Sequence, residues 1–156
     1  MATTDLDDMA ALLGDPRVMQ YYPAPKTREQ AEAWIAWNLD NYGRYGFGLW
    51  LVQTLDGSFV GDCGLTMQDV DGQQEVEVGY HVRAELQGQG LATEAALACR
   101  DHATALGVQR LIAIIDPANL PSQRVALKLG MQLEKTSTAH GGVRHIYATE
   151  LPVPTT

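Results

Sequence analysis

Apolar residues recur along this chain with two different spacings, and the longer spacing predicts four helices. Apolar positions between residues 6 and 13 repeat close to every 3.6 residues, as on one face of a helix. Thr27 and Gln30 have the spacing of a capping box and open a second helical pattern. Gly107 and Gly130 follow two later helical patterns as C-terminal glycines. The predicted helices are Asp5–Leu13, a segment from Thr27 to near Gly43, Gly90–Leu106 and Asn119–Leu129.

Shorter apolar runs bounded by turn residues predict strands. The pairs Asp56-Gly57 and Asp71-Gly72 stand between such runs and are strong hairpin signals. Arg110–Ile115 is continuously apolar after its first residue, as expected of a strand covered on both faces. The predicted strands are Phe47–Leu55, Phe59–Met67, Glu75–Val82, Arg110–Ile115, Met131–Ser137 and Val143–Thr149. The pattern predicts an α/β (α+β) fold with a mixed sheet of about six strands and helices on both faces.

Composition narrows the class of protein. The chain has 156 residues, 46% apolar, which predicts a single domain over 1–156. No apolar run is long enough to cross a bilayer, and the acidic N-terminus does not read as a signal peptide, so we expect a cytoplasmic protein without a membrane partner. Two cysteines, Cys63 and Cys99, predict neither a disulfide framework nor a metal site.

Charge bears on the partners. A net charge of −8 disfavours nucleic-acid binding, which depends on cationic neutralisation of phosphates. It would also repel a polyanionic ligand at long range, so any diphosphate must be held by local backbone donors and nearby cations. An acidic surface attracts a cationic amine, although acidity that serves only solubility explains the charge equally well.

The segment Gln87-Gly88-Gln89-Gly90-Leu91-Ala92 carries the clearest chemistry. Small residues stand where a helix begins, so unpaired N–H groups at the positive end of the helix can approach an anion. A dinucleotide-binding fingerprint fails because Thr93 occupies the place of its third glycine, and a P-loop fails because no lysine follows. The segment is therefore a candidate cradle for another diphosphate.

The remaining pattern, Gln87-x-x-Gly90-x-Ala92, resembles the acyl-CoA diphosphate loop of the GNAT acetyltransferase superfamily. Further motifs agree in order, and the resemblance covers about Asp5 to Thr149. They are Glu77–Arg83, Leu91–Ala95, Asn119-x-x-Ser122-x-x-Val125 and Lys128–Met131. Asp15–Met19, Trp34-Ile35 and Gly61–Leu65 look like the branch that acetylates protein N-termini, the ribosomal-protein (RimJ/RimL-like) type.

The resemblance implies a mostly antiparallel sheet with two splayed central strands and acetyl-CoA held between them as donor substrate. The four histidines of the chain are not spaced as metal ligands, so we expect no metal. A backbone N–H near Val82 would polarise the thioester carbonyl. The residues it implies for coenzyme binding are His81, Val82, Arg83, Gln87, Gly88, Gln89, Gly90, Leu91, Ala92, Thr93, Asn119, Ser122 and Lys128. The cations nearest in sequence are Arg83, Arg124 and Lys128. Each of them could equally be a solvated surface residue or a phosphate-binding residue.

Two features depart from the family pattern. A first strand usually precedes the opening helix, whereas this chain begins at the helix, so we expect that strand to be missing. Many relatives also carry a tyrosine acid four residues before the glycine that ends the later helix, and here that position is Ala126.

Glu77 is the candidate base that takes a proton from the amine, directly or through water. Glu75 and Glu77 lie on one face of the predicted strand, with Val76 and Val78 on the other, and burial would raise the pKa of Glu77. Its alternative roles are ordering the backbone or binding an ammonium group. Ser122 is a candidate acid for the leaving thiolate, with coenzyme contact or a first-turn hydrogen bond as alternatives.

The acceptor is predicted to be a primary amine, a protein or peptide N-terminus first and a polyamine, amino acid or amino sugar next. An α-amino group, with a pKa of about 8, demands less of a base than a lysine does. The residues proposed to contact the acceptor are Tyr21, Tyr22, Trp37, Tyr45 and Glu75. Trp34 fits a half-buried core position. A coenzyme-binding sensor that has lost turnover is the rival prediction, and the protein is expected to be a monomer or a homodimer.

Overall fold

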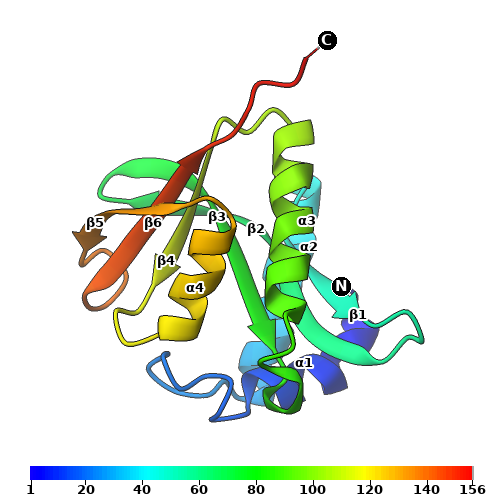
Figure 1. Cartoon of the computed structure of the whole chain (residues 1–156). Coiled ribbons are helices and arrows are strands. Elements are labelled where there is room, and N and C mark those ends of the chain that lie inside the picture. Colours follow the sequence, from blue (N-terminus) through cyan, green and yellow to red (C-terminus); the bar gives the residue numbers. More distant parts are fainter. Residues whose placement is uncertain (156) are drawn as a thin grey trace. The chain divides into compact units, whose positions relative to one another are not determined.

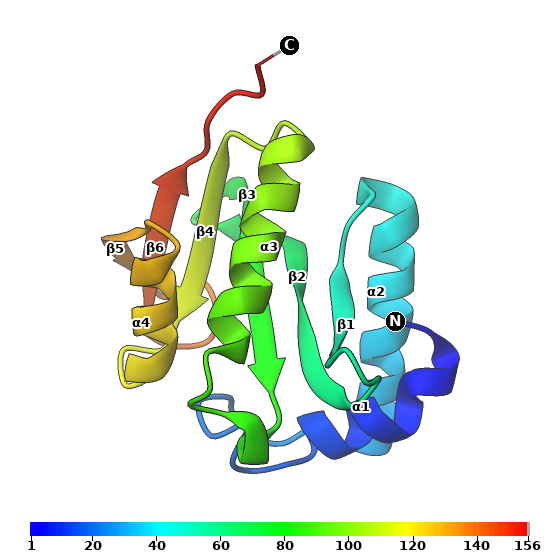
Figure 2. The same cartoon turned by 45° about the vertical axis from the view of Figure 1, so that its right-hand side comes forward.

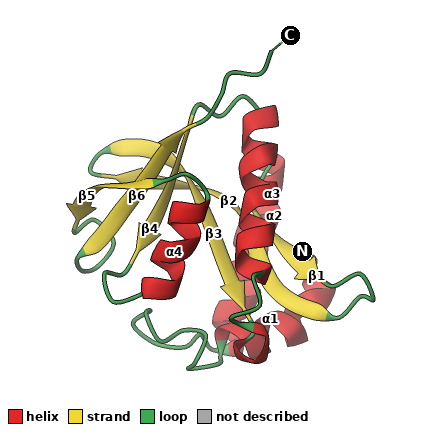
Figure 3. Ribbon diagram, viewed as in Figure 1, coloured by secondary structure: helices red, strands yellow, loops and turns green. Residues whose placement is uncertain are grey.

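The computed structural model describes residues 1–155 and has a six-stranded mixed sheet with strand order β1-β2-β3-β4-β6-β5 (Figure 1). The strands are β1 (Leu49–Gln53), β2 (Phe59–Val70), β3 (Gln73–Val82), β4 (Arg110–Ile115), β5 (Gln132–Ser137) and β6 (Arg144–Glu150). The helices are α1 (Leu6–Leu13), α2 (Arg28–Tyr45), α3 (Leu91–Ala105) and α4 (Leu120–Lys128), with 3-10 turns at Thr3–Asp5 and Ala84–Leu86. The predicted α/β class and mixed sheet are confirmed (Figure 3).

Several element boundaries differ from the prediction, among them the end of α2 and the strand ends at the β2–β3 turn. Helix α2 continues past Gly43, which a helix tolerates, and ends at Gly46, whose φ of 75° is the left-handed conformation that terminates helices. Strands β2 and β3 extend to either side of the turn Asp71-Gly72, where both residues have positive φ. This is the backbone of a tight two-residue hairpin turn, so pairing carries the strands through polar residues up to the turn.

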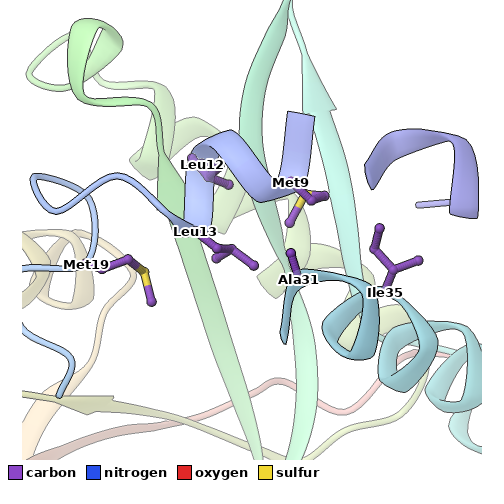
Figure 4. Close-up of a cluster of buried hydrophobic side chains, with 6 residues drawn as sticks. All are labelled: Met9, Leu12, Leu13, Met19, Ala31 and Ile35. Atoms are coloured by element: carbon purple, nitrogen blue, oxygen red, sulfur yellow. The ribbon is translucent and has the colours of Figure 1, made fainter. Parts of the chain in front are cut away.

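The chain forms two compact units, and the first contains Met1–Gly64 and Tyr80–Ala92. Its core joins α1 to α2 and to the first two strands (Figure 4). The buried cluster consists of Met9, Leu12, Leu13, Met19, Ala31 and Ile35, with Leu51 and Phe59 packed against it. A buried amide links α2 to β1, because Oδ1 of Asn38 accepts a hydrogen bond from the Leu49 N–H at 2.7 Å.

The second unit contains Leu65–Gly79 and the described chain from Thr93 onward. Strand β6 pairs antiparallel with both β4 and β5, and α4 packs against β4 (Figure 2). Val70, Ile112 and Ile146 are buried together, with Ile114 and Ala148 against them. These residues form the buried apolar cluster shared by β2, β4 and β6.

Strands β3 and β4 are parallel, and their pairing is short. The register places Val76 opposite Leu111 and Glu77 opposite Ile112. β3 runs on to Val82, whereas its paired positions with β4 stop at Glu77 among the described residues.

Candidate active site

The glycine-rich loop leads into α3 as the sequence predicted. Gly88 and Gly90 have φ of 79° and 81°, a conformation that L-residues adopt at a cost of about 1–2 kcal/mol. A Cβ on either glycine would meet no atom within 4 Å, so the backbone there is open. Residues 87–90 are exposed, and the first N–H groups of the fifteen-residue helix α3 have no intrahelical partner. The loop can therefore surround an anion with backbone donors.

Side chains of the same unit hold this loop in place. Gln87 Nε2 donates to the Val82 carbonyl oxygen at 3.0 Å, which ties the loop to the end of β3. Arg83 donates to the Phe59 carbonyl oxygen at 3.2 Å and remains exposed. Gln87, the side chain that begins the motif, thus stabilises the loop conformation and leaves the backbone amides of the loop to a ligand. Leu91, Ala92 and Thr93 are half-buried in the first turn of α3.

Glu77 is a carboxyl group beside a buried apolar side chain. Ile112, opposite it in the β3–β4 register, is fully buried. Burial raises the pKa of Glu77 to about 8, although the residue keeps part of its surface accessible. The carboxyl is therefore mostly protonated at pH 7 and ionises near the pKa of an α-amine. The structure agrees with the expectation that burial perturbs this group.

Glu75 lies on the same strand face but has a partner. Arg110 Nε donates to both carboxylate oxygens of Glu75, at 3.1 and 3.2 Å, and its terminal nitrogens bind Glu134. The parallel register explains this pair, because Arg110 precedes Leu111, the residue opposite Val76. Glu75 is thus neutralised within its own unit, and its predicted contact with the acceptor has to compete with Arg110.

The start of α4 holds two of the predicted residues together. Asn119 caps the helix, with its Oδ1 accepting from the Ser122 N–H at 3.2 Å. Lys128, in the last turn, is exposed. Ala126 is fully buried, so its position faces the interior, and Tyr147 of β6 donates from its hydroxyl to Gln123 Oε1 at 3.0 Å nearby on the same helix.

His81 has a different environment from the one that coenzyme binding implied. Its Nδ1 lies 2.8 Å from Asp62 Oδ1, and its Nε2 lies 2.8 Å from the Tyr22 hydroxyl. Asp62 Oδ2 also accepts a hydrogen bond from Trp34 Nε1 at 3.1 Å. The side chain of His81 is therefore engaged with these groups, so any coenzyme contact by His81 would come from its backbone.

Sequence reasoning missed Asp62 as a functional candidate. Asp62 is 1% exposed in the otherwise apolar segment of β2 between Gly61 and Gly64. A buried carboxylate is costly unless it is paired and hydrogen-bonded, so an aspartate inside an apolar strand was the available signal. Trp34 is half-buried as expected, and its indole N–H is one of the donors that satisfy Asp62.

The other proposed acceptor residues are aromatic and partly exposed. Tyr22, Trp37 and Tyr45 are 46%, 36% and 39% exposed, and Tyr21 is half-buried. Trp37 packs on Trp34 with ring centroids 5.3 Å apart, and Tyr45 stacks on Phe47 at 5.8 Å. The Tyr22 hydroxyl is hydrogen-bonded to His81.

The described residues offer neither a metal site nor a membrane-spanning helix. No cluster of three or more His, Cys, Asp or Glu side chains suitable for a metal ion occurs within residues 1–155. Within the same residues, every helix is too short or too polar to traverse a lipid bilayer. Cys63 and Cys99 are both buried, and neither belongs to a disulfide.

Comparison with known proteins places this geometry in a family. The family model described as "Acetyltransferase (GNAT) domain" matches residues 1–132. The uncharacterized protein YkkB of Bacillus subtilis (strain 168) is 39% identical over 135 residues, which are 83% of this chain and 78% of that protein. The uncharacterized N-acetyltransferase YnaD of the same organism is 32% identical over 123 residues, 77% of this chain and 69% of that protein.

A solved structure shares the fold. The acetyltransferase from Agrobacterium tumefaciens strain C58 superposes with a TM-score of 0.83 at 22% identity, covering 96% of this chain and 86% of that chain. At that identity the likeness concerns the fold alone. The family model and YkkB each cover most of this sequence, and on these two findings the chain belongs to the GNAT acetyltransferase family.

Proposed function

We propose that this protein transfers the acetyl group of acetyl-CoA to a primary amine, most favourably the N-terminus of a protein or peptide, by direct transfer in a ternary complex. The observation that carries the proposal is the open loop at residues 87–92, with left-handed Gly88 and Gly90, leading into α3. Its backbone amides suit the diphosphate of coenzyme A. When bound, the coenzyme supplies an activated thioester whose thiolate leaves as the amine attacks.

The preference for an α-amine is supported by the pKa of Glu77. A carboxyl with a pKa of about 8 ionises together with an α-amino group, whereas a lysine amine keeps its proton about two pH units longer. Glu77 would accept a proton from the acceptor nitrogen, directly or through water. The net charge of −8 favours approach of a cationic amine.

One structural neighbour has a substrate named in its title. The structure titled RimL, ribosomal L7/L12 alpha-N-protein acetyltransferase, contains coenzyme A and superposes with a TM-score of 0.76 at 16% identity. Its title states its own substrate. For this chain it supplies a first acceptor to test.

The proposal is tested by a panel of amines with acetyl-CoA and a thiol-detecting readout. Peptides with a free N-terminus are compared with the same peptides N-terminally blocked, with spermidine, a free amino acid and glucosamine. Faster thiol release with the free peptide supports the proposal, and faster release with a small amine moves the acceptor to that class. Tight coenzyme binding without thiol release for any amine would favour a sensor, a reading consistent with Ala126 in place of a tyrosine.

Gly90→Ala should weaken the binding of coenzyme A about tenfold. The substitution forces an L-residue into a φ of 81°, which costs about 1–2 kcal/mol, and the loop can avoid that cost only by turning its amides. Titration calorimetry with coenzyme A measures the change.

Gly57→Ala is the matched control for this loop variant. Gly57 has a φ of 89° and equally open surroundings, but it lies in the β1–β2 turn. The control should lose similar stability and keep its affinity for coenzyme A. Equal affinities for Gly90→Ala and the wild type would contradict a role of this loop in binding.

A further inference from the structure

Three side chains in the first compact unit form a continuous chain of hydrogen bonds from an exposed residue to a buried carboxylate. Tyr22 belongs to the loop between α1 and α2, His81 to the end of β3 and Asp62 to β2. Both links, from Tyr22 to His81 and from His81 to Asp62, are 2.8 Å long. Tyr22 is 46% exposed, whereas the side chains of His81 and Asp62 are 6% and 0% exposed.

Hydrogen-bond chemistry assigns the direction of this chain. An ionised carboxylate only accepts, so Nδ1 of His81 donates to Asp62. In the neutral imidazole Nε2 is then the bare nitrogen, and it accepts the Tyr22 hydroxyl proton. The lone pairs on the Tyr22 oxygen can in turn accept from an N–H of an ammonium group.

Asp62 has a second hydrogen-bond donor besides His81. It also accepts from Trp34 Nε1, and the Trp34 and Tyr22 rings lie 5.9 and 5.3 Å from the His81 ring. The buried carboxylate of Asp62 is thus held by two donors, and it fixes the position and the tautomer of the His81 ring. This is the arrangement that orients a histidine for proton transfer.

The charged groups around the cluster come from the elements packed against it. Lys26 of the same loop places its ammonium 5.1 Å from the centre of the Trp34 ring. From α2, Tyr42 has its pKa raised to about 12, by burial first and then by the charges of Asp62 and Asp5. On β3, Arg83 is exposed and bonded to the Phe59 carbonyl. Around His81, Asp62 is thus the anion in hydrogen-bond contact.

We propose that Tyr22, His81 and Asp62 form a proton relay that takes the first proton from the acceptor ammonium. The ammonium N–H passes its proton to the Tyr22 oxygen as the Tyr22 hydroxyl proton passes to His81 Nε2. The products are a neutral amine, an intact tyrosine and an imidazolium paired with Asp62. The proposal rests on the amine acetyltransferase function proposed above.

An ammonium loses two protons on becoming an amide, and the relay is proposed for the first of them. One proton leaves before the nitrogen attacks, and the second leaves the nitrogen once it has bonded to the acetyl carbon. Because Glu77 is mostly protonated at pH 7, it is a poor acceptor for the first proton at neutral pH. The relay supplies that acceptor at neutral pH, whereas Glu77 can accept a proton only as the pH rises through its pKa.

Tyr22→Phe is the decisive variant because Tyr22 is exposed and the phenyl ring keeps its contact with His81. Without the relay only the fraction of amine that is already neutral reacts, about a tenth or less below pH 7 for an α-amine. We expect kcat/KM for a peptide amine to fall about 10- to 100-fold at pH 6.5 and less than about threefold at pH 9.5. His81→Gln should show the same dependence on pH. The affinity for coenzyme A should stay unchanged in both variants.

Matched controls and a second acceptor separate this role from a structural one. His102→Gln and Asp40→Asn change exposed residues of α3 and α2 and should leave kcat/KM unchanged at every pH. 2,2,2-Trifluoroethylamine is neutral at pH 6.5, so Tyr22→Phe should not slow its acetylation at that pH. A loss that is equal at all pH values, or no loss, in an enzyme that acetylates peptide amines would overturn the relay and leave the proposed function standing.

The hydrogen-bond chain is also tested without turnover. Nitrogen-15 NMR of the wild-type protein should show His81 protonated at Nδ1 and bare at Nε2, with the Nε2 resonance shifted in Tyr22→Phe. A proton on Nε2 of neutral His81 would overturn the relay. If the wild-type protein acetylates no amine at all, the proposed function fails and the catalytic role of the relay fails with it.

Discussion

Replacing Glu77 with glutamine should lower kcat/KM for a peptide amine about a hundredfold at pH 9 and change it little at pH 6.5. A base acts only when ionised, and the pKa of Glu77 is about 8, so its contribution appears as pH rises through that value. Glutamine keeps the shape of the side chain and cannot accept the proton. The pH dependence of kcat/KM over pH 6–10 measures the effect.

The same substitution should raise stability at high pH. The native protein holds the Glu77 proton up to about pH 8, whereas the unfolded chain releases it near pH 4.5, so the wild-type protein loses stability as pH rises between these values. After discounting for partial exposure, we expect Glu77→Gln to exceed the wild type by about 2–3 kcal/mol at pH 9 and to match it at pH 4. Urea unfolding at the two pH values tests this.

A Glu77→Gln protein that is folded and stabilised but about a hundredfold less active at pH 9 would separate chemistry from folding. Glu32→Gln, on the exposed face of α2, is the control and should change neither quantity. Wild-type rates at pH 9 in Glu77→Gln would remove Glu77 as a base. The opposite pH dependences expected for Glu77→Gln and Tyr22→Phe keep the two proton acceptors distinguishable.

Local rules were sufficient to predict most of the fold. Asp71-Gly72 predicted a tight turn because only residues that tolerate positive φ fit it, and the structure has φ of 53° and 87° there. The predicted end of α2, near Gly43, was too early because either of two glycines, Gly43 and Gly46, could end the helix. The helix ends at the glycine that adopts the left-handed conformation, and the local sequence pattern does not predict which of the two does so.

The candidate site was predictable where its residues are neighbours in the sequence. The loop at 87–92 and the capping of α4 by Asn119 depend on short spacings. The relay joins residues that are 19 and 59 positions apart, so the partners of His81 depend on how β2 and the loop before α2 meet β3. The Arg110–Glu75 pair likewise depends on a parallel register between separate strands.

The second large effect concerns the close contact of β1 with β2. Gly64→Ala should destabilise the protein by about 3 kcal/mol or more, enough to lower Tm by roughly 6–12 °C. A Cβ at this position would overlap the Gly48 carbonyl oxygen and lie 2.7 Å from the Leu49 Cα. Both atoms are backbone, and Gly64 is paired with Leu49 in the β1–β2 ladder, so only a separation of the strands relieves the overlap. Thermal unfolding with Gly43→Ala as control measures the effect.

Gly43→Ala is the control because it should raise the stability of the protein, whereas Gly64→Ala should lower it. Gly43 lies inside α2 with nothing within 4 Å of its Cβ position, so alanine should stabilise the helix by about 0.5–1 kcal/mol. If Gly64→Ala were equally harmless, close strand approach would not be what this glycine provides.

Gly61 presents the same restriction on the other side of Asp62, since a Cβ there would overlap the His81 carbonyl oxygen. The two glycines thus let β2 approach both β1 and the end of β3, and this approach sets Asp62 within hydrogen-bond distance of His81.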